Sequence, residues 1–484
     1  MKNSAFTILS TFSRGELKSF SEFINSPFHN KNNKVIIFFD FLRKYYPDFS
    51  HSDLNSEKLF AAMYGNASFR ESYIRNLLSD LKILAENFLV HTRVSRKDQK
   101  NKILIEELHE RDLTVLLNKK IEAFEKETAK RKLKDQEYFL NKLFVYEIKS
   151  FVIVDKTLTD SFRKDQILSL INFFFISIME SSFHFAVEEQ RVNIRHEYTF
   201  LRNILEFVKH NEEKFSQIPL LMIYYHLWLS FLNENADINF RAAKNIFKMN
   251  FETLTQTDKK NIYSIMQIYY DNKIRSGDIS CNFQLLNLLL EMLKHKVISH
   301  NRKNSISLNL YRNILILCFK LKEKVKLKYF ITEYLKFVRT ESRSTISAYS
   351  SAHLNFLENN FEEALVMCQR IDFSKLLTTT NENLYFKIDV RTLMLKCFYE
   401  LRSFESALSH LQTFRHFLNN SKIIKESSKE NLMFIIRAVN EMISLNFNYD
   451  EYKMVQLKKR IMTSKDNPGT EWIERKIIEI EKRK

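Results

Sequence analysis

Residues 68–90 read SFRESYIRNLLSDLKILAENFLV, and this stretch predicts the clearest helix of the chain. Its apolar residues recur at helical spacing and form one unbroken stripe, which consists of Ile74, Leu77, Leu78, Leu81, Leu84, Ala85 and Phe88. We expect Ser68 and Glu71 to cap its start, because a serine followed three residues later by a glutamate can satisfy two free amides. The opposite face carries Arg70, Arg75, Asn76, Ser79 and Lys82.

Residues that make turns are scarce along the whole chain. Its 484 residues include four glycines and four prolines, whereas ordinary usage is about 7% glycine and 5% proline. The alternation of apolar and polar residues that is typical of a strand never continues for more than a few positions. The composition therefore predicts an all-α protein whose helices are joined by short polar turns.

The first hundred residues contain further signals for helix boundaries. Ser13 and Glu16 fit a capping box. Pro27 should end the helix that follows, because proline disfavours helical geometry in the residue before it. Two more helices are expected at about 32–46 and at Ser56–Tyr64.

The length of the chain limits how its core can be organised. A single core rarely grows beyond about 250–300 residues, so the chain must divide into domains or grow one repeat at a time as a solenoid. We predict an N-terminal helical module at residues 1–95, a middle helical region at 96–210 and an α-solenoid at 211–484.

The C-terminal part contains one internal similarity. Residues 360–365 read NFEEAL, and residues 403–408 read SFESAL, 43 positions later. We expect an aromatic residue and a small alanine to pack each pair of helices, and the residues concerned are Phe361, Ala364, Phe404 and Ala407.

This pattern resembles the tetratricopeptide repeat, in which such residues open the second helix of a pair. The resemblance covers about 90 residues and implies stacked helix pairs. The spacing departs from the family's period of about 34 residues, and the usual glycine before the turn is missing. Leu357-Glu358-Asn359 and Leu401-Arg402-Ser403 stand there instead. A helix hairpin without repeat ancestry is the alternative.

A second resemblance concerns the N-terminal region. The stretch around Ser26-Pro27-Phe28 and the segment Ile74–Leu81 look like a region that recurs in uncharacterised, helical, glycine-poor bacterial proteins. This resemblance implies a bacterial cytoplasmic protein. It implies no activity.

The chain is strongly basic, with a formal net charge of +17. Such a charge fits an anionic partner, but the abundance of Lys, Asn, Ile and Phe also fits the codon bias of an AT-rich genome. The densest basic stretch lies within 302–343 and has lysines at every second position from Lys320 to Lys328. We interpret it as a solvated turn between helices, with an anion-binding or nucleic-acid patch as the alternative.

The sequence contains no recognisable catalytic or cofactor motif. Glycine-rich phosphate loops are excluded because no two glycines lie close enough together. Glu106 and His109 have the spacing of a di-iron helix, but a second copy is missing. The cysteines Cys281, Cys318, Cys368 and Cys397 are widely spaced and fit buried free thiols. We therefore predict no enzyme activity, no cofactor and no metal.

Two functions lead at this level, and an enzyme assembled from residues that are distant in sequence is a third, weaker option. The first is a cytoplasmic, non-enzymatic scaffold that binds a protein or peptide partner on the concave surface of the solenoid. The alternative is a nucleic-acid-binding regulator in which 56–64 and 68–90 resemble a helix-turn-helix and a helical repeat acts as the sensor. In that case the contacts with bases would come from Arg75, Asn76, Ser79 and Lys82. We expect no membrane insertion, because the longest uncharged runs are shorter than a membrane span.

Overall fold

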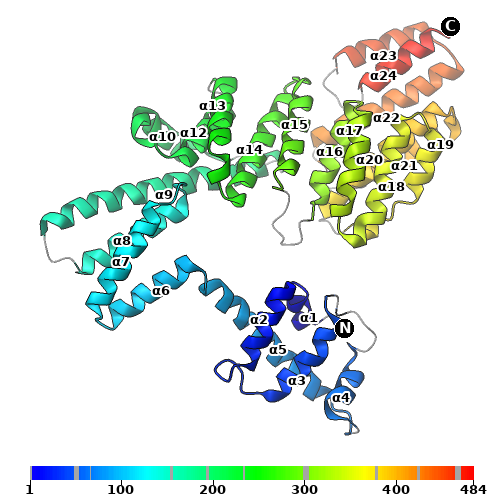
Figure 1. Ribbon diagram of the computed structural model, residues 1–484. Coiled ribbons are helices and arrows are strands. Elements are labelled where there is room, and N and C mark those ends of the chain that lie inside the picture. The colour runs from blue at the N-terminus through cyan, green and yellow to red at the C-terminus, as the bar shows by residue number, and fades with distance from the viewer. Residues whose placement is uncertain are drawn as a thin grey trace. The chain divides into compact units, whose positions relative to one another are not determined.

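The computed structural model describes residues 3–47, 49, 54–65, 67–152, 156–191, 196–232, 235–297, 305–376, 380–421, 424, 426–463 and 470–483. Within these residues the chain forms 24 α-helices and no strand (Figure 1). The prediction of an all-α protein is therefore confirmed.

The described chain divides by its contacts into two compact units. The first comprises residues 1–130 and 147–156, and the second comprises 131–146 and 157–484. A division by contacts does not show which segments of the chain fold independently. The three domains expected at 1–95, 96–210 and 211–484 therefore remain a prediction.

Helix α5 lies at the centre of the core of the first unit and packs against the four helices before it. The helices of this unit are α1 (Ser4–Leu9), α2 (Arg14–Asn25), α3 (Asn33–Leu42), α4 (Ser56–Tyr64), α5 (Glu71–Val94), α6 (Lys97–Glu110) and α7 (Thr114–Ala129), with a 3-10 helix at Arg43–Tyr45. All seven residues of the predicted α5 stripe are buried. The helical period of the sequence thus identified the buried face correctly.

The two predicted capping boxes have different outcomes. At α2 the Glu16 amide donates to Ser13 Oγ at 3.2 Å and the Ser13 amide donates to Glu16 Oε2 at 2.8 Å, which confirms that box. The box at Ser68 is wrong, because α5 begins at Glu71 and Arg70 precedes it in an extended conformation without a side-chain cap. The Phe69 ring packs edge-on against Phe60 on α4, at 5.5 Å between centroids, so the residues just before Glu71 make a tertiary contact and not a cap.

The second unit consists mainly of helices that pack in consecutive pairs. Helix α8 (Gln136–Val152) is divided between the two units after residue 146, and the long helix α9 (Lys156–Arg191) belongs to the second unit from residue 157 onward. The remaining helices are α10 (Thr199–His210), α11 (Glu212–Phe215), α12 (Pro219–Phe231), α13 (Ala236–Met249), α14 (Gln256–Arg275), α15 (Cys281–Lys294), α16 (Leu308–Lys320), α17 (Lys324–Tyr334), α18 (Thr340–Leu357), α19 (Phe361–Gln369), α20 (Thr380–Glu400), α21 (Phe404–Asn420), α22 (Glu426–Phe447), α23 (Glu451–Thr463) and α24 (Thr470–Glu481).

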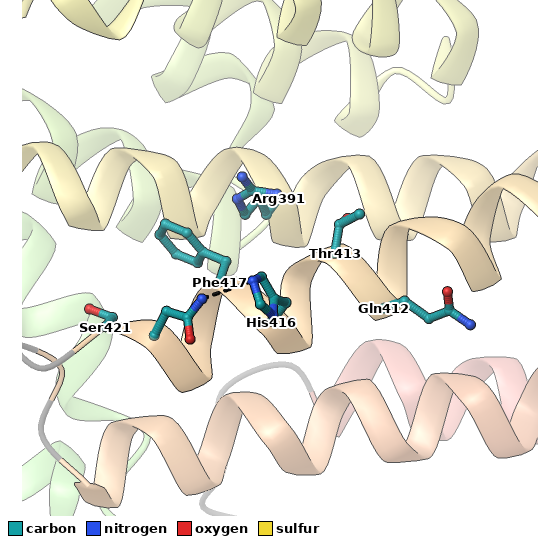
Figure 2. A pocket seen from close by; sticks show the side chains of 7 residues that line it. Arg391, Gln412, Thr413, His416, Phe417 and Ser421 are labelled. Carbon is teal, nitrogen blue, oxygen red and sulfur yellow. Dashed lines mark hydrogen bonds between the residues drawn. The ribbon is translucent and has the colours of Figure 1, made fainter.

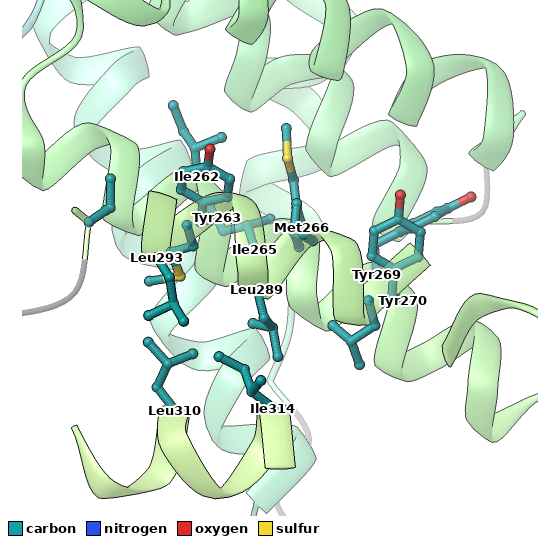
Figure 3. Close-up of a cluster of buried hydrophobic side chains, with 14 of the residues drawn as sticks. Ile262, Tyr263, Ile265, Met266, Tyr269, Tyr270, Leu289, Leu293, Leu310 and Ile314 are labelled. Atoms are coloured by element: carbon teal, nitrogen blue, oxygen red, sulfur yellow. The ribbon is translucent and has the colours of Figure 1, made fainter. Parts of the chain in front are cut away.

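The pairs are α12 with α13, α14 with α15, α16 with α17, α18 with α19, and α20 with α21. We call α12, α14, α16, α18 and α20 the first helices. First helices also contact one another, α12 with α14, α16 with α18 and α18 with α20. Where α14, α15 and α16 meet, Tyr263, Leu289 and Ile314 lie in one continuous apolar cluster (Figure 3).

Three pairs share the same turn between their two helices. Lys322, Asn359 and Arg402 each have a positive φ, between 55° and 63°, and the next helix begins two residues later. At the last of these turns the Arg402 amide donates to Tyr399 O at 3.0 Å and the Ser403 amide donates to Phe398 O at 2.9 Å. This is the Schellman pattern, which usually places glycine at the left-handed position.

Candidate functional site

The four residues proposed to read DNA lie on one face of α5. Arg75, Asn76 and Ser79 are exposed and Lys82 is half-buried. The Arg75 guanidinium lies 3.8 Å from Glu71 Oε2, and Lys82 Nζ lies 3.5 Å from Glu86 Oε1. Both cations of this face are therefore partly neutralised by carboxylates on the same helix.

The four residues proposed to pack the repeats occupy equivalent positions in their pairs. Ala364 and Ala407 have no exposed surface, and the two phenylalanines are half-buried at the first residue of α19 and α21. The Phe361 ring contacts Phe356 at 5.2 Å between centroids, and the Phe404 ring contacts Tyr399 at 5.7 Å. Each aromatic ring thus packs against the end of the helix before its own.

The lysine-rich run lies at a turn between helices, as predicted, since α16 ends at Lys320 and α17 begins at Lys324. Lys324 Nζ lies 3.3 Å from Glu358 Oε1, and Lys326 Nζ lies 3.0 Å from Glu323 Oε1. Lys322 pairs with Glu471. Lys322, Lys324 and Lys326 are therefore neutralised by nearby carboxylates. Lys320 differs from them, because its surroundings contain other cations.

An open pocket of about 900 Å³ lies between α20 and α21 (Figure 2). The Arg391 guanidinium is 4.6 Å from the Phe417 ring centroid, and burial lowers the pKa of Arg391. The His416 ring is hydrogen-bonded to Asn420 at 2.9 Å. The other residues that line the pocket are Gln412, Thr413 and Ser421. The lining includes no carboxylate or thiol, so it offers no acid–base pair or strong nucleophile.

A more distinctive group of charges lies on α16, α18 and α20. The Arg312 guanidinium binds Asp389 with two contacts, Nε to Oδ2 at 2.5 Å and Nη2 to Oδ1 at 2.7 Å. The Tyr349 hydroxyl donates to Asp389 Oδ2 at 2.7 Å. Burial alone would lower the pKa of Arg312, but Asp389 and Tyr349 outweigh it and raise that pKa. The charge of Asp389 is therefore committed to Arg312.

Two lysines beside this pair have no such partner. Among the described residues, no carboxylate oxygen lies within 4 Å of the ammonium group of Lys320 or Lys396. Lys396 Nζ lies 5.9 Å from the Phe319 ring centroid and 5.5 Å from the Trp472 ring. Burial lowers the pKa of Lys396 to about 8, and the nearby charges of Lys320 and Arg475 add to this effect.

The carboxylate nearest in sequence to Lys396 is engaged elsewhere. Glu400 accepts a hydrogen bond from Trp472 Nε1 at 2.7 Å and pairs with Lys476 Nζ at 2.6 Å. We call Arg312, Lys320, Lys396 and Arg475 the cationic strip. Its members lie on α16, α20 and α24, and neighbouring members interact electrostatically. This strip is the candidate functional site, and its chemistry is suited to holding an anion.

In the sequence, Lys320 stands out only as part of a lysine run, and Lys396 was not among the predicted site residues. A signal for Lys396 was nevertheless present, because residues 393–397 read LMLKC. A lysine within an apolar helical stretch is either extended to solvent along its aliphatic stem or held in a special environment. The helix alone does not reveal that Phe319 and Trp472 supply that environment.

The described residues contain no cluster of three or more His, Cys, Asp or Glu side chains that could hold a metal ion. The four cysteines are buried and free, as expected. Burial raises the pKa of Cys318 and that of Cys368 to about 12. A thiol with so high a pKa is a poor nucleophile at neutral pH.

Helix α9 contains one stretch, Phe162–Ala186, that is long and apolar enough to cross a membrane. It includes four charged residues, which are Arg163, Lys164, Asp165 and Glu180. Its composition is weak evidence, since a core helix of a soluble protein meets the same criterion.

Comparison with known proteins found no match to a family model, to a curated protein or to a solved structure.

Proposed function

We propose that this protein is a non-enzymatic scaffold that binds a peptide or protein partner. In this proposal its C-terminal helix pairs form a tetratricopeptide-like α-solenoid, and the first helices present the binding surface. The contacts between successive first helices support this arrangement. So do the repeated turns at Asn359 and Arg402, which give successive pairs the same geometry.

The cationic strip is the observation that carries the proposal. Lys320 and Lys396 lie on first helices and form no ion pair with a carboxylate among the described residues, so their positive charge is available to a ligand. Tyr385 lies beside Arg312 of the same strip, with 50% of its surface exposed and its ring 5.2 Å from the Arg312 guanidinium carbon. Exposed aromatic rings next to cations are frequent among residues that dominate the energy of protein interfaces.

The proposal can be tested with the full-length chain and a phage-displayed peptide library. We expect selection to converge on related peptides whose binding is lost in the Tyr385→Ala variant. Tyr329→Ala is the matched control, because this tyrosine is also exposed but lies on the second helix α17. A selection that yields no related peptides would count against the scaffold.

The alternative function is nucleic-acid binding by α5, and the exposure of Arg75 and Asn76 on one face favours it. In that case affinity for duplex DNA should fall steeply with salt, and Arg75→Ala and Asn76→Ala should weaken sequence preference. Lys18→Ala is the control, because Lys18 is an exposed cation on α2. If the purified protein does not bind duplex DNA even at low salt, this alternative is excluded.

A further inference from the structure

The cationic strip has an excess of positive charge after its own ion pairs are counted. Arg312 is matched by Asp389, and Glu400 is matched by Lys476. Lys320, Lys396 and Arg475 have no carboxylate oxygen within 4 Å among the described residues, and Asp271 and Asp389 attract Lys320 only from a longer distance. Like charges that lie close together raise the free energy of the unbound protein. An anion that binds between these cations is attracted by each of them and also reduces their mutual repulsion.

The strip also holds its charges in place. The Lys396 side chain lies between the rings of Phe319 and Trp472. Trp472 is itself fixed by its hydrogen bond to Glu400 at 2.7 Å. An ammonium group held in this way loses little conformational freedom when a ligand binds, and this reduces the cost of binding.

The chemistry of the strip favours carboxylates over a polyphosphate backbone. Its unmatched cations are Lys320, Lys396 and the exposed Arg475. The two lysines act as compact point charges, which suit single carboxylates. The carboxylates of Asp389 and Glu400 lie along the same strip and would repel a continuous phosphate backbone. An acidic side chain can approach each lysine separately and avoid these carboxylates.

We propose that the cationic strip binds an acidic segment of a partner protein, with its carboxylates at Lys320 and Lys396. The exposed ring of Tyr385, which lies beside Arg312, then contacts an apolar residue of the same segment beyond the carboxylate at Lys320. This proposal rests on the scaffold function and specifies the chemistry of its partner.

The test uses the full-length protein and two short fluorescein-labelled peptides, measured by fluorescence anisotropy at physiological ionic strength. One peptide alternates glutamate with leucine, and the other has glutamine in place of every glutamate. We expect the glutamate peptide to bind at least about tenfold more tightly, since charge-assisted hydrogen bonds are stronger than neutral ones.

Variants of the strip locate the site. Lys320→Gln should weaken binding of the glutamate peptide by about tenfold, the size expected for one charge-assisted contact. This variant should fold, because Lys320 is exposed. Lys396→Met should have a similar effect while keeping an aliphatic chain between the rings. Lys328→Gln is the matched control, since it removes the same charge from an exposed position on α17.

The possible results separate the two proposals. Equal affinity for both peptides would overturn the acidic-segment proposal and leave the scaffold intact. An equal loss in Lys320→Gln and Lys328→Gln would also overturn it, because general electrostatic attraction would then explain the binding. Duplex DNA that displaces the peptide from the wild type and binds Lys320→Gln more weakly would assign the strip to nucleic acid. If neither these peptides nor the displayed library binds, the scaffold function itself fails.

Discussion

Replacing Asp389 by alanine should destabilise the C-terminal helices by about 3 kcal/mol, because it leaves a largely buried arginine without its counter-ion. The Arg312 and Asp389 side chains are only 16% and 11% exposed, and two contacts of 2.5 and 2.7 Å join them. Truncating one partner of such a pair costs about 3–5 kcal/mol. The residual exposure admits some water, so we expect the lower end of that range.

Part of this cost comes from the tyrosine that shares the carboxylate. Tyr349 is fully buried, and its hydroxyl donates to Asp389. Without the carboxylate, that hydroxyl becomes an unsatisfied buried donor, which costs about 1–2 kcal/mol. Tyr349→Phe removes the donor together with its bond and should cost about 1 kcal/mol. The difference between these two variants separates the ion pair from the hydrogen bond.

A double-mutant cycle provides the sharper test. Replacing both partners, Arg312→Met with Asp389→Leu, should cost less than Asp389→Ala alone, because an apolar pair leaves no buried charge. The assay is urea unfolding followed by circular dichroism, with the midpoint and slope recorded for each variant. A loss below about 1 kcal/mol for Asp389→Ala, the typical value for an exposed ion pair, would refute this reasoning. So would a double variant as unstable as the sum of its single substitutions.

Three further predictions concern the same unit. Arg402→Gly should raise the free energy of unfolding by about 0.5–1 kcal/mol, because glycine relieves a left-handed conformation at the cost of a more flexible unfolded chain. Asn359→Gly should raise it less, since asparagine tolerates that conformation. Equal increases in urea unfolding would contradict this reasoning. Burial lowers the pKa of His353 to about 4, below its unfolded value of about 6.5, so the unfolded chain binds the proton first. This group's contribution to stability should therefore be complete above about pH 6.5 and fall by up to about 3 kcal/mol as pH falls towards 4, and His353→Gln should remove that part of the pH dependence in calorimetry. Lys396→Met should stabilise the protein by about 1–2 kcal/mol at neutral pH, because it removes an ammonium group whose pKa is lowered by burial. A lower unfolding midpoint for this variant would show that the ammonium group makes a favourable contact in the folded protein.

The sequence predicted the helices well because their signals are local. The stripe on α5 repeats with the period of the helix, and the serine before α2 needs only its own glutamate to form a cap. The prediction at Ser68 was wrong for a tertiary reason, since Phe69 packs against a ring on another helix. A capping motif describes which hydrogen bonds are available. It does not describe what the neighbouring aromatic residue will contact.

The turns between helices show a second limit. The missing glycine before each repeated turn was noted as a departure from the tetratricopeptide pattern. Asn359 and Arg402 nevertheless adopt the left-handed conformation that glycine would favour. The hydrogen bonds of the turn and the packing of Ala364 and Ala407 compensate for the strain. Sequence rules based on the cost of one residue do not include this compensation, because it arises from the hydrogen bonds of the whole turn and the packing of the helix that follows.

The candidate site was the least predictable feature because its components are far apart in sequence. Lys320, Lys396 and Arg475 come from three helices and share no motif. Lys320 and Arg475 each resemble an ordinary surface cation, and only the apolar neighbours of Lys396 set it apart. Their significance comes from the contrast with Arg312 and Lys476, which lie nearby and are both paired with carboxylates.

That contrast is the reason to assign the strip a role in binding. A fold that needed only stability would be served better by an apolar residue at position 396, between two aromatic rings and close to two other cations. Local chemistry that opposes folding is expected where a protein binds something. An acidic ligand would restore the missing partner, so the feature that weakens the free protein would strengthen the complex. A Lys396→Met protein that is more stable and binds acidic peptide more weakly would show both effects in one residue. A variant that is more stable but binds the peptide equally well would show that Lys396 destabilises the free protein without contributing to binding.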